Sequence, residues 1–443
     1  MNERTKPTVR TDRPAVGGAD TLPLGIRVLA LLCISAAALV LRVMAFPATN
    51  HDMIDHQIPW LSQLQQIGFW KAISAPFSQY GYTPFYTYAM GVSNALFPAG
   101  TGPDPILKSI PVFFDFIAAS LVYAIARLRW GDGWRAVIGF AAILFAPTVY
   151  LNGAYWGQTD VIYTSFLLAC VYMLLRRSDV WAMVFFGAAL SIKLQAIWIG
   201  PFILMMVLRG RIRWWLLIVP AVVYFALALP TFFVGRSVVE VSTIYLTQAG
   251  TATMLTYSAA NLLFFPQYFL YHLNWWPESL PFVAKTFLIL TTVLSLLFAW
   301  KSSKGKLSDE ALIIAVVVSQ LLVPQFLPHM RNRYFFAADV FIILLAVWNP
   351  RYWFAAIIMQ LNSFVTYISF LWGGILLASP VPQWLKVFGF TNNLQWVTGL
   401  IAAAGIANFI LLLWFWRRLH ECLNEDLPKV VALAPGAIGN VPN

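Results

Sequence analysis

Charged residues are scarce in this chain of 443 residues: only 11% are Asp, Glu, Lys or Arg, while 60% are apolar. A soluble domain typically carries about 25% charged residues, so this scarcity argues against a water-soluble enzyme. A membrane-spanning helix needs roughly 20 apolar residues, and twelve such helices would use about 240, which this chain can supply. The apolar runs are continuous and do not alternate with polar residues, which excludes an outer-membrane barrel. The composition therefore predicts an all-α polytopic membrane protein with about 11 to 12 transmembrane helices.

Cysteine is also rare, and sequence motifs of several common chemistries are missing. The three cysteines, Cys33, Cys170 and Cys422, lie in or just beyond apolar runs and do not have metal-ligand spacing. An odd count without a paired pattern argues against a disulfide framework. There is no Walker loop, Rossmann fingerprint, paired zinc-ligand motif or nucleophile elbow. Nothing in the sequence therefore supports nucleotide-driven transport or the use of soluble nucleotide sugars, and we expect no metal and no cofactor.

Acidic residues are outnumbered by basic ones, 18 to 29, which gives a net charge of +11. In a membrane protein this excess is explained by the enrichment of Lys and Arg in cytoplasmic loops, so no nucleic-acid partner is expected. About 20 of the basic residues lie at one set of alternating span ends, which predicts that both termini are cytoplasmic. Beyond the N-terminal tail, these clusters lie around 127–135, 176–177, 209–213, 301–306, 351 and 417–418.

The expected organisation is a single transmembrane domain over 24–420, between a disordered tail at 1–23 and a second cytoplasmic tail at 421–443. The first apolar run is too long for a signal-peptide core and lacks a convincing cleavage site, so it should be an uncleaved span. The fifth and sixth expected spans, 180–192 and 195–208, are too short for each to cross the membrane fully. They predict a short hairpin with its tip near Lys193. The expected spans are roughly 24–46, 106–127, 135–155, 158–175, 180–192, 195–208, 214–234, 282–300, 310–328, 335–348, 352–374 and 396–416.

Two segments on the outward side are unusually long, at about 47–105 and 235–281. In the first, apolar residues after Asp52 recur near helical spacing, which predicts an amphipathic helix on the membrane surface. These residues are Ile54, Ile58, Leu61, Leu64 and Ile67. The stretch from Thr83 to Phe97 is a candidate for a second such helix, and Trp275 and Trp276 are typical of an interfacial segment.

The first polar candidate follows the first span, where Asp52 and Asp55 are three residues apart and share one face of a helix. A carboxylate held against an apolar membrane surface has its charged form disfavoured, which moves its pKa toward that of a usable general base. The alternative is structural, with Asp52 capping the surface helix and Asp55 in its first turn.

Two further candidates lie at the outer ends of later spans. Asp160 closes the segment Trp156-Gly157-Gln158-Thr159-Asp160 and either belongs to a site or caps the following helix. Lys193 lies at the predicted hairpin tip, where an ammonium group is energetically expensive and by default indicates function. The alternative for Lys193 is snorkelling to the interface.

Arg331 and Arg333 follow the ninth span on the side that is poor in positive charge, so their presence needs a reason. A guanidinium group binds phosphate through two parallel hydrogen bonds and suits a lipid phosphate at headgroup level. A structural role at the interface is the alternative. Asp115, inside the second span, either pairs with one of the site cations or satisfies a neighbouring helix.

Four sequence blocks, in this order, carry a family resemblance: Asp52-Met53 with Pro59-Trp60, the segment Tyr82 to Tyr88, the segment Trp156 to Asp160 with Tyr163, and the segment Ser191 to Ala196. With this layout the chain resembles the GT-C class of integral membrane glycosyltransferases. More narrowly, it resembles the bacterial relatives of the second mannosyltransferase of GPI-anchor assembly. Where relatives commonly read Met-His-Glu-Arg-Tyr, this chain reads Met330-Arg331-Asn332-Arg333-Tyr334.

The resemblance implies an inverting transfer of a sugar, most of all mannose, from a polyprenyl phosphate to a hydroxyl of a lipid-linked or glycan acceptor. The transfer would take place on the outer side of a bacterial inner membrane. The family's catalytic aspartate matches Asp52, and the donor phosphate would be bound by Lys193, Arg333 and Arg331. The remaining substrate-binding candidates are Asp55, His56, Tyr82, Trp156, Gln158, Asp160, Gln195 and Tyr334.

Two other functions stay open at this point. One is a polymerase or ligase of surface glycans that uses a polyprenyl-pyrophosphate carrier. The other is a transporter or flippase of polyprenyl-linked glycans, which would favour repeated halves and polar groups near the bilayer midplane. The acidic residues of this chain instead gather at one face, which favours the transferase.

Overall fold

The computed structural model describes residues 21–74, 82–249, 253–273, 275, 278–371 and 393–425. The predicted tails lie almost entirely outside these residues, as do parts of both long loops. The last helix, α20, continues to Asn424, a few residues past the predicted end of the transmembrane domain at 420.

Helices dominate the described chain. The first part contains α1 (Leu24–Ala45), the π-helical turn η1 (Met53–Gln57), α2 (Ile58–Ile67), α3 (Phe69–Ser74), α4 (Pro84–Leu96), α5 (Pro103–Trp130) and α6 (Trp134–Leu144). The middle part contains α7 (Pro147–Tyr150), η2 (Leu151–Tyr155), α8 (Asp160–Leu175), α9 (Asp179–Leu190), η3 (Leu194–Ile199), α10 (Gly200–Leu208), η4 (Trp214–Ile218) and α11 (Val219–Phe233). The last part contains α12 (Val238–Ala249), β1 (Thr256–Tyr257), α13 (Phe264–His272), α14 (Leu280–Lys301), α15 (Asp309–Phe326), β2 (Met330–Arg331), α16 (Phe336–Trp348), η5 (Pro350–Tyr352), α17 (Trp353–Leu371) and α20 (Asn393–Asn424).

Each predicted span coincides with a helix, but the helices fall into two length classes. In the described chain, seven helices are long and apolar enough to cross a membrane: α1, α5, η4 with α11, α14, α15, η5 with α17, and α20. The α6 helix and the α7–η2 pair meet at an angle of 44°, and they add an eighth crossing if the bent pair is one span. The others, α8, α9, η3 with α10, and α16, are shorter apolar helices. The protein is therefore an all-α integral membrane protein, and four of the predicted spans are shorter apolar helices in the described chain.

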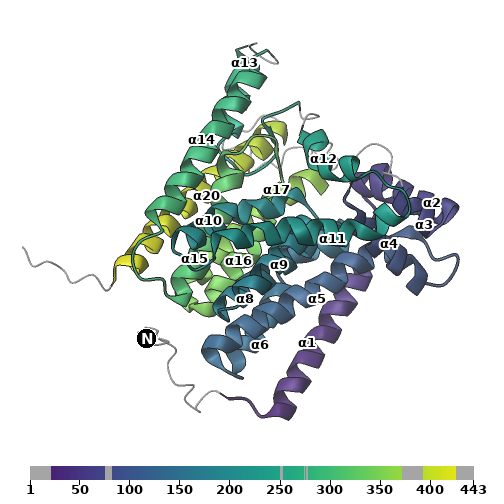
Figure 1. Cartoon of the computed structure of the whole chain (residues 1–443), viewed down its shortest axis with the longest axis horizontal. Coiled ribbons are helices and arrows are strands. Elements are labelled where there is room, and N and C mark those ends of the chain that lie inside the picture. Colours follow the sequence, from purple (N-terminus) through teal and green to yellow (C-terminus); the bar gives the residue numbers. More distant parts are fainter. Residues whose placement is uncertain are drawn as a thin grey trace, which may run out of the picture.

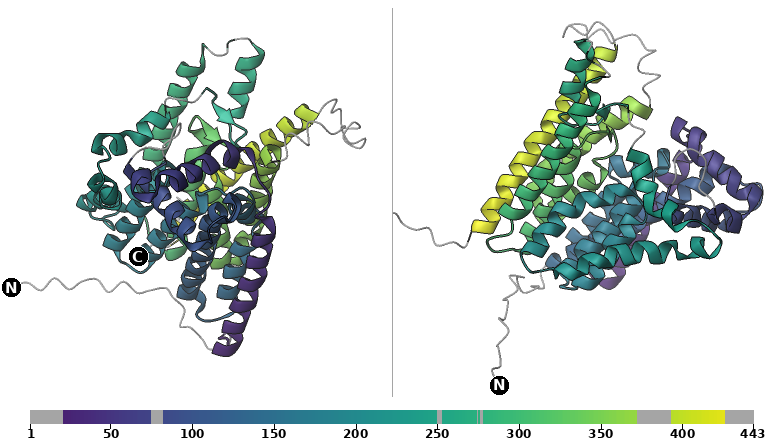
Figure 2. Two further views of the ribbon diagram at one scale, coloured as in Figure 1. Left: turned by 90° about the vertical axis from the view of Figure 1, so that its right-hand side faces the viewer. Right: turned by 45° about the horizontal axis from the view of Figure 1, so that its top comes forward.

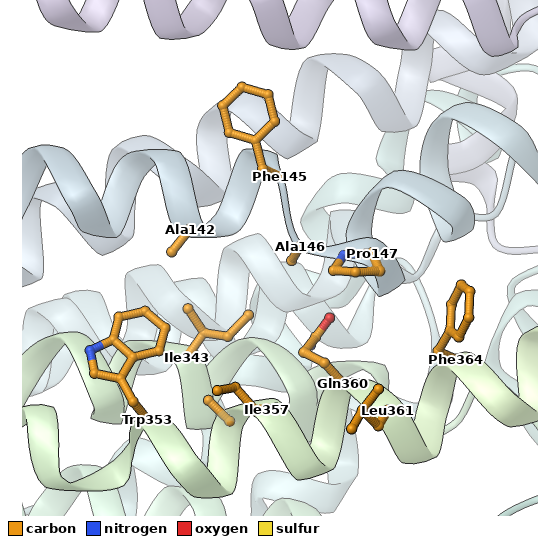
Figure 3. A pocket seen from close by; sticks show the side chains of 11 residues that line it. Ala142, Phe145, Ala146, Pro147, Ile343, Trp353, Ile357, Gln360, Leu361 and Phe364 are labelled. Carbon is orange, nitrogen blue, oxygen red and sulfur yellow. The ribbon is translucent and has the colours of Figure 1, made fainter.

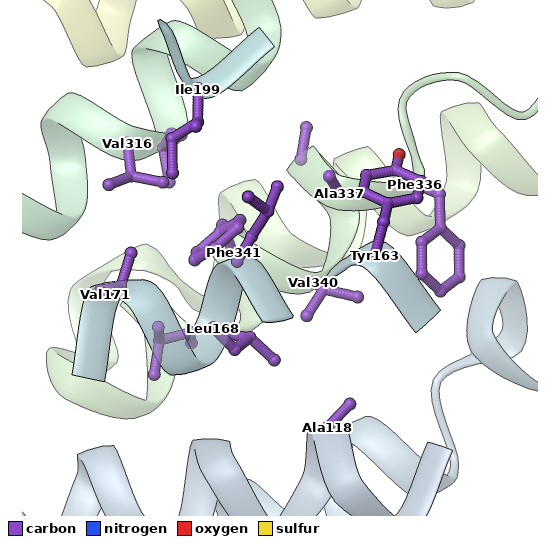
Figure 4. Close-up of a cluster of buried hydrophobic side chains, with 14 of the residues drawn as sticks. Ala118, Tyr163, Leu168, Val171, Ile199, Val316, Phe336, Ala337, Val340 and Phe341 are labelled. Carbon is purple, nitrogen blue, oxygen red and sulfur yellow. The ribbon is translucent and has the colours of Figure 1, made fainter. Parts of the chain in front are cut away.

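Two of the short helices, α8 and α16, lie inside the bundle. Every residue of α16 is buried, and so is most of α8, while α1 and α14 expose most of their apolar surface. A helix that is hydrophobic all round belongs in a core and does not need to match the membrane thickness. Figure 4 shows this core, where Leu168 and Val171 of α8 lie near Phe341 of α16 and Val316 of α15.

The loop helices and the basic clusters lie at opposite ends of the bundle. Figures 1 and 2 show α2, α3 and α4 as a group beyond the end of α1, far from the N-terminal end of that helix. At the other end, Asp132 pairs with both Arg27 and Arg127, and Glu310 pairs with both Arg129 and Arg351. Basic clusters from separate helix ends therefore share one layer, as the charge pattern predicts.

Asp115 pairs with a cation that the sequence analysis did not consider. Its Oδ2 accepts a hydrogen bond from Arg42 Nε of α1 at 2.8 Å, and both side chains are fully buried. The other guanidinium nitrogens of Arg42 donate to the carbonyl groups of Ala38 and Leu144. Asp115 therefore joins two neighbouring helices and takes no part in the cation cluster of the site described below.

Candidate functional site

Asp52 lies at the start of the loop helices and accepts three hydrogen bonds through one carboxylate oxygen. The donors to its Oδ2 are Trp156 Nε1 at 3.0 Å, Gln158 Nε2 at 3.0 Å and Arg333 Nη1 at 3.1 Å. In the described part of the chain, Oδ1 accepts no hydrogen bond, and the side chain is 16% exposed. Asp52 makes no capping bond to the backbone of η1, so the structural alternative for this residue is wrong.

The backbone of the turn from Trp156 to Gln158 also accepts hydrogen bonds from the segment that follows α1. Asn50 Nδ2 donates to the Trp156 carbonyl and Gln57 Nε2 to the Gly157 carbonyl, each at 3.0 Å. Gly157 has a φ of +74°, a conformation that glycine adopts without steric cost. A Cβ at this position would lie 3.2 Å from the Met53 sulfur. The turn and the segment after α1 therefore position Asp52 as one unit.

Asp160, the first residue of α8, joins the two cations of the site. Its Oδ1 accepts a hydrogen bond from Lys193 Nζ at 2.6 Å, and its Oδ2 lies 3.5 Å from Arg333 Nε. Asn152 Nδ2 donates to the same Oδ2 at 3.0 Å. The carboxylate is fully buried and makes no capping bond to α8, so the capping alternative is wrong for Asp160 too.

Lys193 lies at the corner between α9 and η3, where the predicted hairpin has its tip. Its backbone is extended, with φ −154° and ψ 139°, which turns the chain from one helix into the next. Thr83, at the N-terminus of α4, donates its hydroxyl hydrogen to the Ser191 carbonyl and so holds this corner. The side chain is 10% exposed and paired with Asp160, which rules out snorkelling to the interface.

Arg333 connects the two carboxylates, since its Nη1 bonds Asp52 while its Nε faces Asp160. Its guanidinium lies over the Trp156 ring, 5.1 Å from the centroid. Burial opposes the charged form, but Asp52 and Asp160 outweigh it and hold the pKa of Arg333 above its usual value. Arg333 therefore stays charged in a site that is nearly closed to water.

The backbone beside Arg333 is fixed by two segments that are far from it in the sequence. Strand β2 pairs in parallel with β1, matching Arg331 to Tyr257, and the Asn332 amide donates to the Tyr257 carbonyl at 3.0 Å. Thr366 of α17 donates to the Asn332 carbonyl at 3.0 Å. This short parallel pairing has no hydrophobic alternation that could have revealed it in the sequence.

Arg331 does not join the cluster. Its side chain is exposed, and its guanidinium lies 5.5 Å from the centroid of the Tyr257 ring, on the second long loop. Asp55 is also exposed. Both candidates are exposed, and among the described residues neither makes a hydrogen bond or ion pair with Asp52, Asp160, Lys193 or Arg333.

The other candidates form an aromatic border. His56 stacks on Trp60 with a centroid distance of 5.9 Å, and Tyr82 meets the same ring edge-on at 5.3 Å. Tyr334 lies edge-on to Trp198 at 5.3 Å, and both Tyr82 and Tyr334 are near enough to act electrostatically on Lys193 and Arg333. Gln195 is half-buried, and its Oε1 finds no partner among the described residues.

Sequence reasoning missed several polar residues that support the site. Asn152 and Asn50 hold Asp160 and the Trp156 turn, and Tyr367 of α17 lies 3.5 Å from Asn152 Nδ2. Lys108 of α5 is fully buried and donates to the carbonyl groups at the end of α1. Polar side chains inside apolar runs were the available signal, since such groups are rare in membrane spans unless they have partners.

The site combines two carboxylates with two cations, and three of the four side chains keep some access to solvent. In the ranges that the structure describes, no three His, Cys, Asp or Glu side chains gather as metal ligands would. Chemically, the arrangement offers a carboxylate oxygen without a donor next to buried positive charge, which suits removal of a proton beside a developing anion.

Comparison with known proteins gives a structural match only. No protein-family model matches the chain, and no curated protein matches it. The fold is similar to that of the crystal structure of ArnT from Cupriavidus metallidurans bound to undecaprenyl phosphate. The two are 14% identical, the match covers 88% of this chain and 76% of that chain, and the TM-score is 0.52. The fold is thus GT-C-like, and at this identity the likeness concerns the fold alone.

Proposed function

We propose that the protein is a membrane glycosyltransferase that moves a sugar from a polyprenyl phosphate to an acceptor hydroxyl. The observation that carries this proposal is Arg333, which bridges Asp52 and the Asp160–Lys193 pair. A base and a phosphate-binding cation are thereby held side by side. The GT-C-like fold supports the same conclusion, since the similar ArnT structure contains undecaprenyl phosphate.

In the proposed reaction, Asp52 Oδ1 takes the proton of the acceptor hydroxyl as its oxygen attacks the anomeric carbon. The bond from that carbon to the phosphate oxygen breaks with inversion, and polyprenyl phosphate leaves. A phosphate ester is a weak base, so it needs charge stabilisation and no proton donor, unlike the leaving group of an inverting hydrolase. Arg333 and Lys193 supply that stabilisation, and no metal is required for a donor with a single phosphate.

The remaining candidates are assigned to substrate recognition. Trp156, Gln158 and Asp160 orient the base and the cations, through the contacts described above. Asp55, His56, Tyr82, Gln195 and Tyr334 contact the hydroxyl groups of sugar or acceptor, and Arg331 meets the donor phosphate on its way in. Mannose is the proposed sugar, and a lipid-linked or glycan hydroxyl is the acceptor.

The proposed location is the inner membrane of a bacterium, with the site facing the periplasm. It follows from the basic clusters, which gather at the end of the bundle opposite the loop helices and are expected on the cytoplasmic side. The proposed organisation is one transmembrane domain over 24–420 with cytoplasmic tails at 1–23 and 421–443.

The test is an assay with purified protein in lipid nanodiscs, polyprenyl-phosphate mannose and candidate lipid acceptors, measuring sugar transfer and release of polyprenyl phosphate. Wild type should release the carrier together with product, and Asp52→Asn should abolish both. Asp55→Asn is the comparison variant: Asp55 is exposed three residues away and is assigned to substrate contact, so this change should lower the rate less than Asp52→Asn does. If Asp55→Asn loses turnover while Asp52→Asn keeps it, the choice of base is wrong. A transporter would release no carrier, and a polymerase or ligase would consume only a pyrophosphate carrier.

A further inference from the structure

An apolar groove with a volume of about 430 Å³ lies between the bent third span and α17 (Figure 3). Phe145 and Pro147 lie on one side, Ile343 of α16 forms its floor, and Ile357, Leu361 and Phe364 of α17 lie on the other side. This volume is within the range of small-molecule sites, which run from about 300 to 1,000 Å³. Nothing in the proposed reaction uses this groove.

The groove exists because the third span is broken at its middle. Pro147 cannot continue the α6 hydrogen bonds, and the residue before it, Ala146, is extended, with ψ 125°. Gln360 of α17 stabilises the break, since its Oε1 accepts from both the amide and the hydroxyl of Thr148. Three of the lining residues, at 142, 146 and 356, are alanines, whose small side chains leave space between the bent third span and α17.

One end of the groove leads to the candidate site. Phe364, at that end, packs against the buried cluster of Leu151, Trp156 and Tyr367. The same Trp156 side chain also belongs to the site, where its Nε1 donates to Asp52 and the Arg333 guanidinium lies 5.1 Å from its ring centroid. Phe364 and the Trp156 cluster therefore link the groove to the phosphate-binding cation.

The side of the groove faces the membrane. Ile357 and Leu361 are 57% and 58% exposed on a helix that is long and apolar enough to cross it. Gln360 is the one polar residue among those that line the groove. A lipid headgroup would find too few partners here, but a hydrocarbon chain can enter sideways from the bilayer without leaving an apolar medium.

We propose that this groove binds the isoprenoid chain of the polyprenyl-phosphate donor and directs its phosphate to Arg333. The inference rests on the proposed function. The position of the groove favours the donor chain over an acceptor lipid. The groove ends beside Trp156, and the phosphate-binding guanidinium lies over the ring of this residue. Transfer from bilayer to groove gains no hydrophobic free energy, since lipid tails are as apolar as the groove. The groove acts by packing against the chain and by orienting the phosphate toward Arg333. It therefore affects lipid binding and not the chemical step.

The experiment uses the full chain in phosphatidylcholine nanodiscs and measures binding of undecaprenyl phosphate without a sugar, so the choice of sugar does not matter. Ile357→Trp fills the groove from its exposed side, and Ile410→Trp is the matched control. Ile410 is 59% exposed on α20 and does not line the groove. We expect Ile357→Trp to weaken binding about five- to tenfold, the scale of losing a modest set of van der Waals contacts. Ile410→Trp should bind like wild type.

Two further measurements identify the occupant. A phosphate with only two isoprene units, too short to use the groove, should bind wild type and Ile357→Trp equally. An undecaprenyl phosphate with a photoreactive group on its chain should label α7 and α17, and excess unlabelled undecaprenyl phosphate should suppress the labelling.

The outcomes separate this proposal from the proposed function. If Ile357→Trp and Ile410→Trp bind the long chain equally, or labelling falls on other helices, the groove proposal is wrong while the transferase stands. If Ile357→Trp instead weakens only the acceptor in the transfer assay, the groove belongs to the acceptor and the proposal is again wrong. If wild type binds no polyprenyl phosphate at all, the proposed function fails with it.

Discussion

Two buried charge clusters in this protein have opposite characters. The Arg42–Asp115 pair lies between α1 and α5 with both side chains at 0% exposure, and each guanidinium nitrogen of Arg42 has a partner. In the Asp52–Arg333–Asp160–Lys193 cluster, three side chains are 9% to 16% exposed, and Asp52 keeps one oxygen without a donor among the described residues. A buried charge in a membrane protein is therefore not enough to identify a site. Access to solvent distinguishes the second cluster from the structural pair, since Asp115 Oδ1 also lacks a hydrogen-bond partner among the described residues.

The largest difference between the two clusters is expected when Asp52 is substituted. Asp52→Asn removes the base but keeps the size and the hydrogen bonds that an amide oxygen can accept, so we expect the transfer rate to fall by about 10² to 10⁴. The thermal unfolding midpoint should stay close to that of wild type. The measurement is kcat in nanodiscs beside a melting curve, and a parallel loss of melting temperature would contradict a catalytic role.

Replacing Arg333 tests whether shape matters beyond charge. Lysine keeps the positive charge but cannot contact Asp52 and Asp160 at once, so Arg333→Lys should lower kcat by about a hundredfold, the scale for one transition-state donor. Arg331→Lys is the comparison variant, and it should lose less activity because Arg331 is exposed and lies over Tyr257, away from the two carboxylates. Equal losses in the two variants would show that the site does not distinguish the buried arginine from the surface one.

Substitutions in the Arg42–Asp115 pair should lower stability and leave activity nearly unchanged. Asp115→Asn leaves the Arg42 charge buried without a counter-ion, which we expect to cost about 3 kcal/mol of unfolding free energy. The double variant Arg42→Met with Asp115→Leu should recover most of that loss, since an apolar pair can replace a buried ion pair. The specific activity of the folded fraction should stay within about twofold of wild type, because neither residue touches the site. A large loss of activity at normal stability would instead link this pair to catalysis.

The smallest effect is expected at the turn that carries Trp156. Gly157→Ala forces a positive φ on a residue with a Cβ and crowds the Met53 sulfur, at a cost of about 1 to 2 kcal/mol. Because the turn also orients Trp156 and Gln158 toward Asp52, we expect about a tenfold loss of kcat from a small displacement. Gly100→Ala is a matched control, since Gly100 has a φ of +86° with nothing near its Cβ position. If both variants lose activity equally, the effect comes from backbone strain and not from the site.

Much of the fold was predictable from particular runs of residues. The spans at 24–46 and 106–127 match α1 and α5 closely, and the helix expected from Thr83 to Phe97 is α4, Pro84–Leu96. The short hairpin around Lys193 was also expected, because two basic clusters enclosed too few residues for two crossings. The sequence does not say whether an apolar run faces lipid or other helices, so the burial of α8 and α16 inside the bundle was not predicted.

The site was predictable only in part, for a related reason. Asp52, Asp160, Lys193 and Arg333 stood out as charges at span ends, but Arg331 looked equivalent to Arg333 and lies elsewhere. Asn152 drew no attention, although it bonds Asp160. The partner of Asp115 was not predicted either, because it comes from a helix 73 positions away.

By itself, the sequence determined that the chain lies in a membrane, where most of its helices begin and end, and at which helix ends the basic residues gather. These properties depend on the length of each apolar run and on the free-energy cost of moving a charge across a bilayer. Both act on each segment independently of the rest of the chain. The tertiary structure alone decided which charge meets which, because ion pairs and hydrogen bonds require contact between helices that are distant in the chain. It also decided that one arginine bridges two carboxylates while its neighbour two residues away lies on a tyrosine at the surface.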